Sequence, residues 1–224
     1  MVISVNGNVD AQKLINSFGN TFGIKNQQKF DYKNYKVTKL TSKKVVAKNI
    51  KDLETAWLFL GWQTAGVSDK KDFVTLKIIN TMLGSGLSSR LYRNLREQDG
   101  LAYQLGSSYS PKALGGNFLT YIGTNPKTLD YSRKKILEEI EKLKTEFVSD
   151  TELQGAKERL KGGFAIALET NSDKANSIGV FETLGFGYDF LNTYLKMIDE
   201  VTASDIVRVA NKYFNSIYVD STVK

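Results

Sequence analysis

Residues 83–103 read LGSGLSSRLYRNLREQDGLAY, and more structural information is concentrated there than anywhere else in the 224-residue chain. A short glycine loop, Gly84-Ser85-Gly86, is followed by a helix that Ser88 can cap and Gly100 can end. Such a loop exposes backbone N–H groups that can bind an anion or a peptide carbonyl. It follows a predicted helix and lacks a subsequent Gly-Lys-Ser/Thr, so a nucleotide-binding loop is not indicated. A plain helix–helix turn remains the structural alternative.

The sequence on both sides of this stretch predicts an α+β fold. Strands are expected over residues 55–62, 101–109, 117–124 and 217–219, and the two middle ones form a hairpin. Helices are expected over 69–83, 88–100, 127–147 and 172–186, and after the capping signatures at Ser149 and Thr202. The resulting order, β-α-α-β-β-α-α-α-α-β, predicts a mainly antiparallel sheet covered by paired helices.

The first 52 residues differ from the rest in charge. They hold 10 Lys and 3 Asp, so they carry the whole net charge of +7. A strand at 2–5 and a helix capped by Asp10 resemble the end of a preceding domain. We therefore expect three parts: this strand–helix unit (1–23), a Lys-rich connector (24–52) with an extended piece near 36–40, and the main domain (53–224). The connector is expected to be solvated. Binding of an acidic partner or a nucleic acid through 25–51 remains an alternative, although the segment contains no Arg.

Composition excludes several kinds of chemistry. The chain has no His and no Cys, which removes the Ser-His-Asp triad, thiol nucleophiles, disulfides and nearly every catalytic zinc site. A hydrophobic content of 41% is sufficient for a sizeable core. No apolar run approaches the roughly 18 residues of a membrane helix, and no signal-peptide pattern opens the chain. We expect a soluble chain with no membrane span, in a compartment that the sequence does not specify.

Taken as a whole, residues 83–103 resemble the second-half signature of the pitrilysin-like, insulinase-type zinc peptidases, the inverted zincins that include mitochondrial-processing-peptidase-like proteins. The matching segments are Leu83–Gly86, Ser88–Leu91, Leu95–Glu97 and Gly100–Tyr103. Weaker matches at 7–10, 152–157 and 202–214 extend the resemblance along most of the chain. The zinc motif of the family, His-x-x-Glu-His, is missing. The resemblance therefore implies the non-catalytic C-terminal half of such a peptidase.

The resemblance also implies roles for particular residues. Arg96 and Tyr103 match a family pair that reaches across to the zinc-binding half, where the tyrosine hydroxyl stabilises the developing oxyanion and the arginine orients the peptide. The loop of Gly84, Ser85 and Gly86 would be a wall of the substrate chamber. No catalytic residue and no metal ligand is expected in this chain alone; zinc would come from the other half, which is fused upstream or supplied by a separate subunit in a homo- or heterodimer.

Without the resemblance, the same residues permit a simpler interpretation. Arg90, Arg93 and Arg96 recur at a spacing typical of a solvated helix face, and Tyr103 at a strand start is typical of a half-buried sheet residue. A degenerate homologue serving as a structural or assembly subunit is the principal alternative function. The leading expectation is that this chain binds a peptide substrate. We expect no role in nucleic-acid binding.

Overall fold

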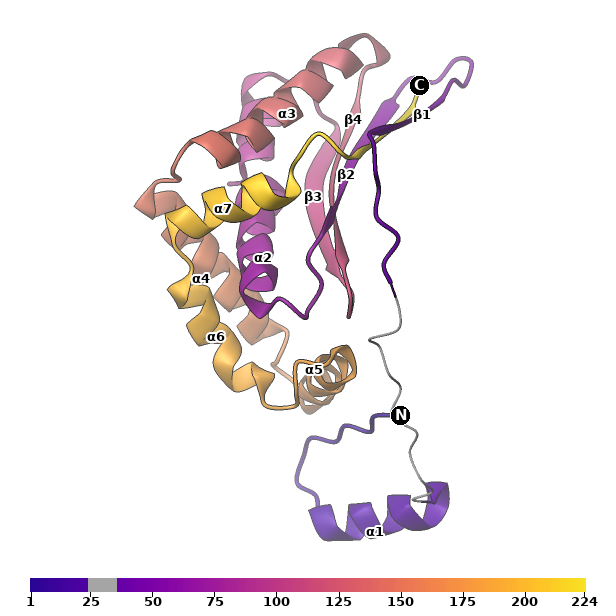
Figure 1. The fold of residues 1–224 in the computed structure, drawn as a ribbon, viewed down its shortest axis with the longest axis vertical. Helices are drawn as coiled ribbons and strands as arrows, with labels where there is room; N and C mark the ends of the chain where they lie inside the picture. The colour runs from indigo at the N-terminus through magenta and orange to yellow at the C-terminus, as the bar shows by residue number, and fades with distance from the viewer. Residues whose placement is uncertain (24–35) are drawn as a thin grey trace.

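A computed structural model describes residues 1–23 and 36–224, and it shows a sheet with helices packed on one face (Figure 1). The strands are β1 (Lys44–Lys48), β2 (Ala56–Thr64), β3 (Gln104–Pro111), β4 (Gly116–Thr124) and β5 (Val219–Val223). Their spatial order is β1-β5-β2-β4-β3. Only the β1–β5 pair is parallel among these strands. The predicted α+β class with a mainly antiparallel sheet is confirmed.

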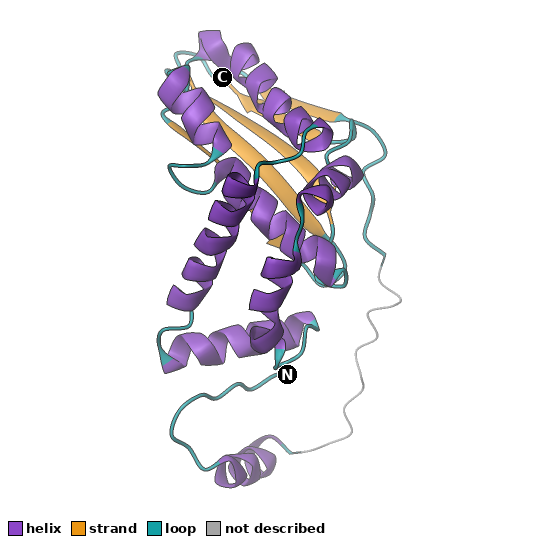
Figure 2. Ribbon diagram, turned by 90° about the vertical axis from the view of Figure 1, so that its left-hand side faces the viewer, coloured by secondary structure: helices purple, strands orange, loops and turns teal. Residues whose placement is uncertain are grey.

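Strand β2 shows why one face of the sheet is covered. Its even-numbered residues from Ala56 to Thr64 are buried beneath the helices, whereas Trp57, Phe59 and Gly61 are half-buried on the opposite face. Successive side chains of a strand point to opposite faces, so one apolar row forms the core and the other lines an open face. Figure 2 shows the helices gathered on the first of these faces.

The helices begin where the capping residues predict. Side chains of Asp69, Ser149 and Thr202 each accept a hydrogen bond from a backbone N–H in the first turn of the helix that follows. The helices are α1 (Ala11–Phe22), α2 (Lys70–Gly84), the π-helix η2 (Tyr92–Gln98), the 3₁₀ turn η3 (Pro126–Thr128), α3 (Leu129–Thr145), α4 (Asp150–Ile166), α5 (Asn171–Leu184), α6 (Phe190–Glu200) and α7 (Ala203–Tyr213). Within the two described segments, no helix has the length and hydropathy needed to cross a bilayer.

The core is centred on α2, which is buried along most of its length. At one end of α2, Phe73 contacts an aromatic cluster from the later helices, and the rings of Phe186 and Phe190 are stacked with centroids 4.1 Å apart. Burying one such side chain contributes about 1.5–3 kcal/mol, so this cluster is a major source of the cohesion between α2, α5 and α6.

The N-terminal part differs from the sequence-based expectations in two places. Residues 2–5 form no strand, since the described chain offers them no strand partner. In the segment interpreted as a connector, residues 44–48 form β1, which is added to the sheet edge by pairing with β5. The expected extended piece near 36–40 is held by the side chain of Gln63, which accepts from Leu40 N at 2.7 Å and donates to Thr38 O at 2.8 Å. The expectations for residues 24–35 lie outside the described part of the chain.

Three further differences concern helices. The segment after the glycine loop is mostly π-helical. Helix α6 was not predicted, because its boundary with the preceding helix is marked only by Gly185 and Gly187. The helix expected over 127–147 ends at Thr145, so Phe147 lies beyond it and is 73% exposed.

Candidate functional site

The π-helix η2 carries Arg96, the first of the two residues singled out by the sequence. Its i→i+5 hydrogen bonding persists to the end, where Asp99 N donates to Asn94 O at 3.2 Å. Gly100 then adopts a φ of +62°, which an L-residue rarely tolerates, and the chain reverses into β3. π-Helical turns are rare and occur frequently at functional sites. The π-helical geometry therefore makes this segment a candidate functional site and not only a connection between α2 and β3.

Two contacts fix η2 against the helices beside it. The guanidinium of Arg90 donates to both carboxylate oxygens of Glu152 in α4, at 2.6 and 2.7 Å. Asn94 donates to Glu139 of α3 at 2.9 Å. Burial alone would lower the pKa of Arg90, but the hydrogen bonds and charge of Glu152 outweigh it and raise the pKa. Arg90 is thus a structural residue, which corrects the interpretation of all three arginines as a solvated face.

Arg96 and Tyr103 lie next to each other at the edge of the sheet. Arg96 Nη1 donates to the carbonyl oxygen of Tyr103 at 3.3 Å, and its guanidinium lies 5.1 Å from the centroid of the Tyr92 ring. Tyr103 N donates to Gly123 O of β4 at 3.0 Å, which positions the backbone just before β3. The Tyr103 side chain is 67% exposed. The guanidinium of Arg96 thus lies against the backbone of Tyr103, and both residues are exposed.

The loop of Gly84, Ser85 and Gly86 is shaped by packing. A Cβ on Gly84 would overlap the backbone nitrogen of Ser107 in β3, so glycine is required for α2 to approach the sheet. Gly86 has a φ of +85° and has open space around it. Ser85 lines a cavity on the helical side of the molecule and accepts a hydrogen bond from Arg159 through its carbonyl oxygen. Gly84 thus has a structural role, whatever the loop contributes to binding.

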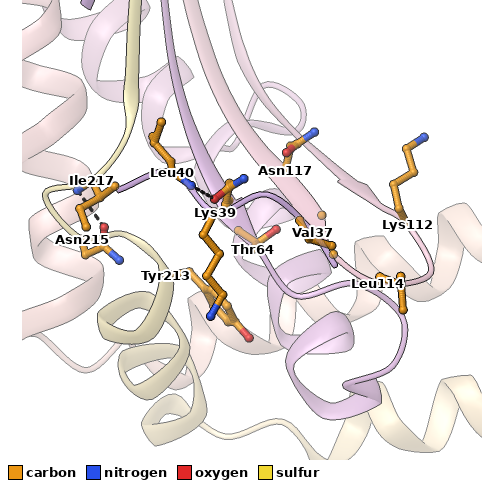
Figure 3. Close-up of a pocket in the computed structure, with 13 residues that line it drawn as sticks. Val37, Lys39, Leu40, Thr64, Lys112, Leu114, Asn117, Tyr213, Asn215 and Ile217 are labelled. Carbon is orange, nitrogen blue, oxygen red and sulfur yellow. Dashed lines mark hydrogen bonds between the residues drawn. The ribbon is translucent and has the colours of Figure 1, made fainter. Parts of the chain in front are cut away.

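The open face of the sheet is apolar. Trp57 stacks on Phe59 with centroids 6.0 Å apart, and Phe59 contacts Tyr121 of β4. A cavity of about 450 Å³ lies further along the same strands, around Gly61 and Leu119. A second cavity, of about 540 Å³, lies between the segment at 37–40, the β3–β4 turn and the residues that follow α7 (Figure 3). Half-buried aromatic rings on an open sheet face are suited to contact a peptide or another protein surface.

A cluster of charges between α2 and α7 was not predicted from the sequence. The buried carboxylate of Asp72 accepts hydrogen bonds from Lys212 at 2.5 Å, Tyr213 at 2.7 Å and Arg208 at 2.7 Å. Burial by itself would raise the pKa of Asp72, but these three donors outweigh it and lower the pKa to about 2. The sequence signal for this cluster is Asp72 itself, an acidic residue on the apolar face of a predicted helix. The cluster fixes α7 on α2 and contains no free carboxylate, so its role is structural.

The side chains of this chain do not fit a catalytic zinc ion. The sequence has neither His nor Cys, and within residues 1–23 and 36–224 no three Asp or Glu side chains come together as a metal-binding group. Imidazole, thiolate and carboxylate groups are the protein ligands that zinc uses, usually in sets of three or four. No chemical step can therefore be assigned to a metal held by these residues.

Comparison with known protein families gives a match over most of the chain. Residues 1–160 match the model described as the peptidase M16 inactive domain. An uncharacterized zinc protease of Rickettsia felis is 30% identical over 226 residues, covering 100% of this chain and 53% of that protein. One from Bacillus subtilis is 28% identical, covering 97% of this chain and 52% of that protein. The chain thus spans about half the length of these curated relatives.

Solved structures give the same result. A protease from Helicobacter pylori superposes with a TM-score of 0.85 at 26% identity, covering 98% of this chain and 54% of that one. A peptidase M16 inactive domain from Pseudomonas fluorescens superposes with a TM-score of 0.74 at 21% identity, covering 81% of this chain and 43% of that one, and supports the fold alone. The resemblance inferred from residues 83–103 is confirmed: this chain belongs to the peptidase M16 inactive-domain family.

Proposed function

We propose that this chain is the substrate-binding, non-catalytic half of a zinc metallopeptidase that cleaves oligopeptides. The carrying observation is the adjacency of Arg96 and Tyr103, both directed outward from a backbone fixed by η2 and β4. Membership of an inactive-domain family whose relatives are named zinc proteases supports the non-catalytic role. The zinc ion is assigned to the other half, because the residues of this chain do not fit it, and the general base is assigned to that half together with the metal.

In this proposal Tyr103 stabilises the transition state. Its phenolic O–H donates a hydrogen bond to the scissile carbonyl oxygen as that oxygen gains negative charge. A donor held in place before the reaction needs no reorganisation, and removal of one such donor commonly lowers turnover by about 10²–10³-fold. The present exposure of Tyr103 is consistent with a hydroxyl that acts on a group supplied from outside this chain.

Arg96 orients the peptide. Its planar guanidinium already donates to a peptide carbonyl, that of Tyr103, and Arg96 is exposed. A fork of several donors can bind the carbonyl groups of an extended substrate in a fixed direction. The cation also lies near the negative charge that develops on the substrate, which adds an electrostatic contribution.

Apolar surface on this chain supports a partner half. Helix α1 lies apart from the helices that cover the sheet (Figure 1), and it has no buried residue. Val5 before this helix and Ile15 and Phe22 within it are exposed. Exposed apolar clusters of this kind mark surfaces that another protein element covers. The partner is the zinc-binding half, and the aromatic open face of the sheet would enclose the peptide between the two halves.

Steady-state kinetics with the zinc-binding half restored, fused or as a second subunit, tests the proposal. Tyr103→Phe keeps the ring and removes the O–H, so we expect kcat to fall about 10²–10³-fold while KM stays nearly unchanged. Arg96→Lys keeps the charge and loses the planar fork, so kcat/KM should fall as well.

The matched control is Arg93→Lys, an exposed arginine of η2 with no hydrogen bond from its side chain among the described residues. It should leave both kinetic constants within twofold of the wild type. An active assembly in which Tyr103→Phe retains full turnover would show that Tyr103 is only a sheet residue. An assembly that binds the partner half without any peptidase activity would favour a structural subunit instead.

A further inference from the structure

A cavity of about 450 Å³ lies among the helices, away from Arg96 and Tyr103. It is lined mainly by α2, α4, α5 and α6, which belong to the helical layer over the sheet (Figure 1). Its walls are mostly apolar and aromatic: Phe73, Leu160, Phe164, Phe181, Phe186 and Tyr194. Cavities of roughly 300–1,000 Å³ with such walls are typical of small-molecule sites.

Lys77 is the first of two cations in this cavity. It projects from the middle of α2, and its Nζ lies 5.9 Å from the ring centroids of both Phe73 and Tyr109. Burial lowers the pKa of Lys77, and no neighbouring carboxylate offsets the effect. A buried ammonium group is costly unless an anion compensates it. Within the described residues, aromatic faces are the only compensation that Lys77 has.

Arg159 of α4 is the second cation. Its guanidinium donates to Thr81 O at 3.3 Å, to Ser85 O at 3.5 Å and to the hydroxyl of Ser88. All three acceptors are uncharged, and Nε is buried without a hydrogen-bond partner in the described structure. Thr81 follows Lys77 by one turn of α2, so the two cations line adjacent parts of the same wall. Neither of them forms an ion pair with a described residue.

A ligand complementary to this cavity carries a negative charge for the two cations and an apolar part for the remaining walls. We propose that this cavity binds a small apolar monocarboxylate, whose carboxylate is held by Lys77 and Arg159 and whose hydrocarbon part contacts the aromatic rings. Apart from the two cations, the walls offer few polar groups, chiefly the hydroxyls of Thr81, Ser85 and Tyr194. A ligand rich in amide groups would leave those groups without partners, which disfavours a long peptide. This site does not depend on the proposed peptidase role.

Calorimetric titration of the 224-residue chain with sodium octanoate tests the site. We expect one equivalent to bind with a Kd below about 1 mM. Octanol has the same hydrocarbon chain without the charge, and it should bind at least tenfold more weakly. Lys77→Met retains the length and apolar contacts of the side chain, so octanoate affinity should fall at least tenfold while octanol affinity is unchanged.

The matched control is Lys196→Met, which removes one positive charge from an exposed position on α6. It should leave octanoate binding unchanged. Thermal unfolding without ligand shows whether Lys77→Met is folded, and we expect its Tm to equal or exceed that of the wild type because a buried charge has been removed. The same Kd for octanoate in wild type and Lys77→Met, equal affinities for octanoate and octanol, or no binding up to about 10 mM would each overturn the proposal.

Two further ligands distinguish the source of the carboxylate. The tripeptide Ala-Ala-Phe has a free carboxylate next to an aromatic side chain, and its C-terminal amide lacks that charge. If Ala-Ala-Phe with a free carboxylate binds more tightly than octanoate, and Lys77→Met abolishes this binding, the site would be assigned to a peptide C-terminus. Binding of octanoate alone would assign it to a fatty carboxylate.

Discussion

Arg90 and Glu152 are joined by two parallel hydrogen bonds across 62 residues of sequence, from Nε to Oε1 at 2.6 Å and from Nη2 to Oε2 at 2.7 Å. Their side chains are only 13% and 22% exposed. The pair connects the start of the Arg96-bearing segment to α4. The same contact explains why Glu152 does not complete a capping box at Ser149: its carboxylate is engaged elsewhere.

Breaking this pair should loosen η2. Arg90→Met leaves the Glu152 carboxylate without its partner, so we expect the free energy of unfolding to fall by about 2 kcal/mol, measured by urea denaturation. Amide hydrogen exchange over residues 92–98 should become faster in the same variant. The control is Lys134→Met, which breaks the exposed Lys134–Glu138 pair and should change stability by less than about 0.5 kcal/mol. Equal effects of the two substitutions would refute the assigned role.

Gly84→Ala should destabilise the chain. The added methyl group would overlap the backbone of Ser107, which cannot move without shifting β3. Overpacking of this kind costs about 1–3 kcal/mol, visible as a lower urea midpoint. Gly155→Ala is the control, because Gly155 lies in α4 with open space around its Cβ position. That substitution should stabilise the chain by about 0.5–1 kcal/mol. A neutral Gly84→Ala would indicate that α2 and β3 are less closely packed than described.

Stability should decline in acid through Asp72 and Asp205. Each has a folded-state pKa of about 2, below the ordinary 3.8, since hydrogen-bond donors outweigh the effect of burial. Their contribution is therefore complete above about pH 4 and is lost as the pH falls toward 2. Asp72→Asn should lower Tm at pH 7 and flatten the decline between pH 4 and 2. Asp130→Asn, at a carboxylate that is 90% exposed, should keep the wild-type slope. Identical slopes for wild type and Asp72→Asn would contradict the assignment.

The chain alone should hold no stoichiometric zinc and hydrolyse no peptide. The lack of His and Cys is the reason. Elemental analysis after dialysis and a fluorogenic-peptide assay check the two halves of this prediction. One tightly held zinc per chain, or turnover that a chelator abolishes, would contradict it.

Periodicity and caps predicted most of the fold. Asp69, Ser149 and Thr202 marked three helix starts, and the hairpin was evident from Pro111 and the glycines at its turn. Strand β1 could not be predicted in this way: all of its residues are exposed, so no apolar alternation distinguishes it from a solvated connector. Its partner, β5, lies far away in sequence, and local patterns carry no information about that pairing.

The candidate site was predicted only in part. The motif indicated Arg96 and Tyr103, and the structure places them in contact, whereas their roles remain predictions. Trp57 and Trp62 lie on opposite faces of the sheet because they are five residues apart along β2, and only Trp62 is fully buried. Lys77 belongs to no motif that would distinguish it within the helix predicted over 69–83. The sequence signal that could have singled it out is a lysine one turn after Phe73, on the buried side of α2.

The position of β5 between β1 and β2 also affects how the chain acquires its structure during translation. Residues 219–223 separate two strands that are made more than 150 residues earlier. At a translation rate of about 5–20 residues per second, β5 is synthesised roughly 8–30 s after β2. Throughout that interval the five residues of β2 that pair with β5, 57–61, present an unpaired edge, a template for pairing with other chains. Nascent chains on ribosomes that translate the same mRNA are therefore at risk of aggregating through β2. A chaperone that shields this edge would raise the yield of folded protein.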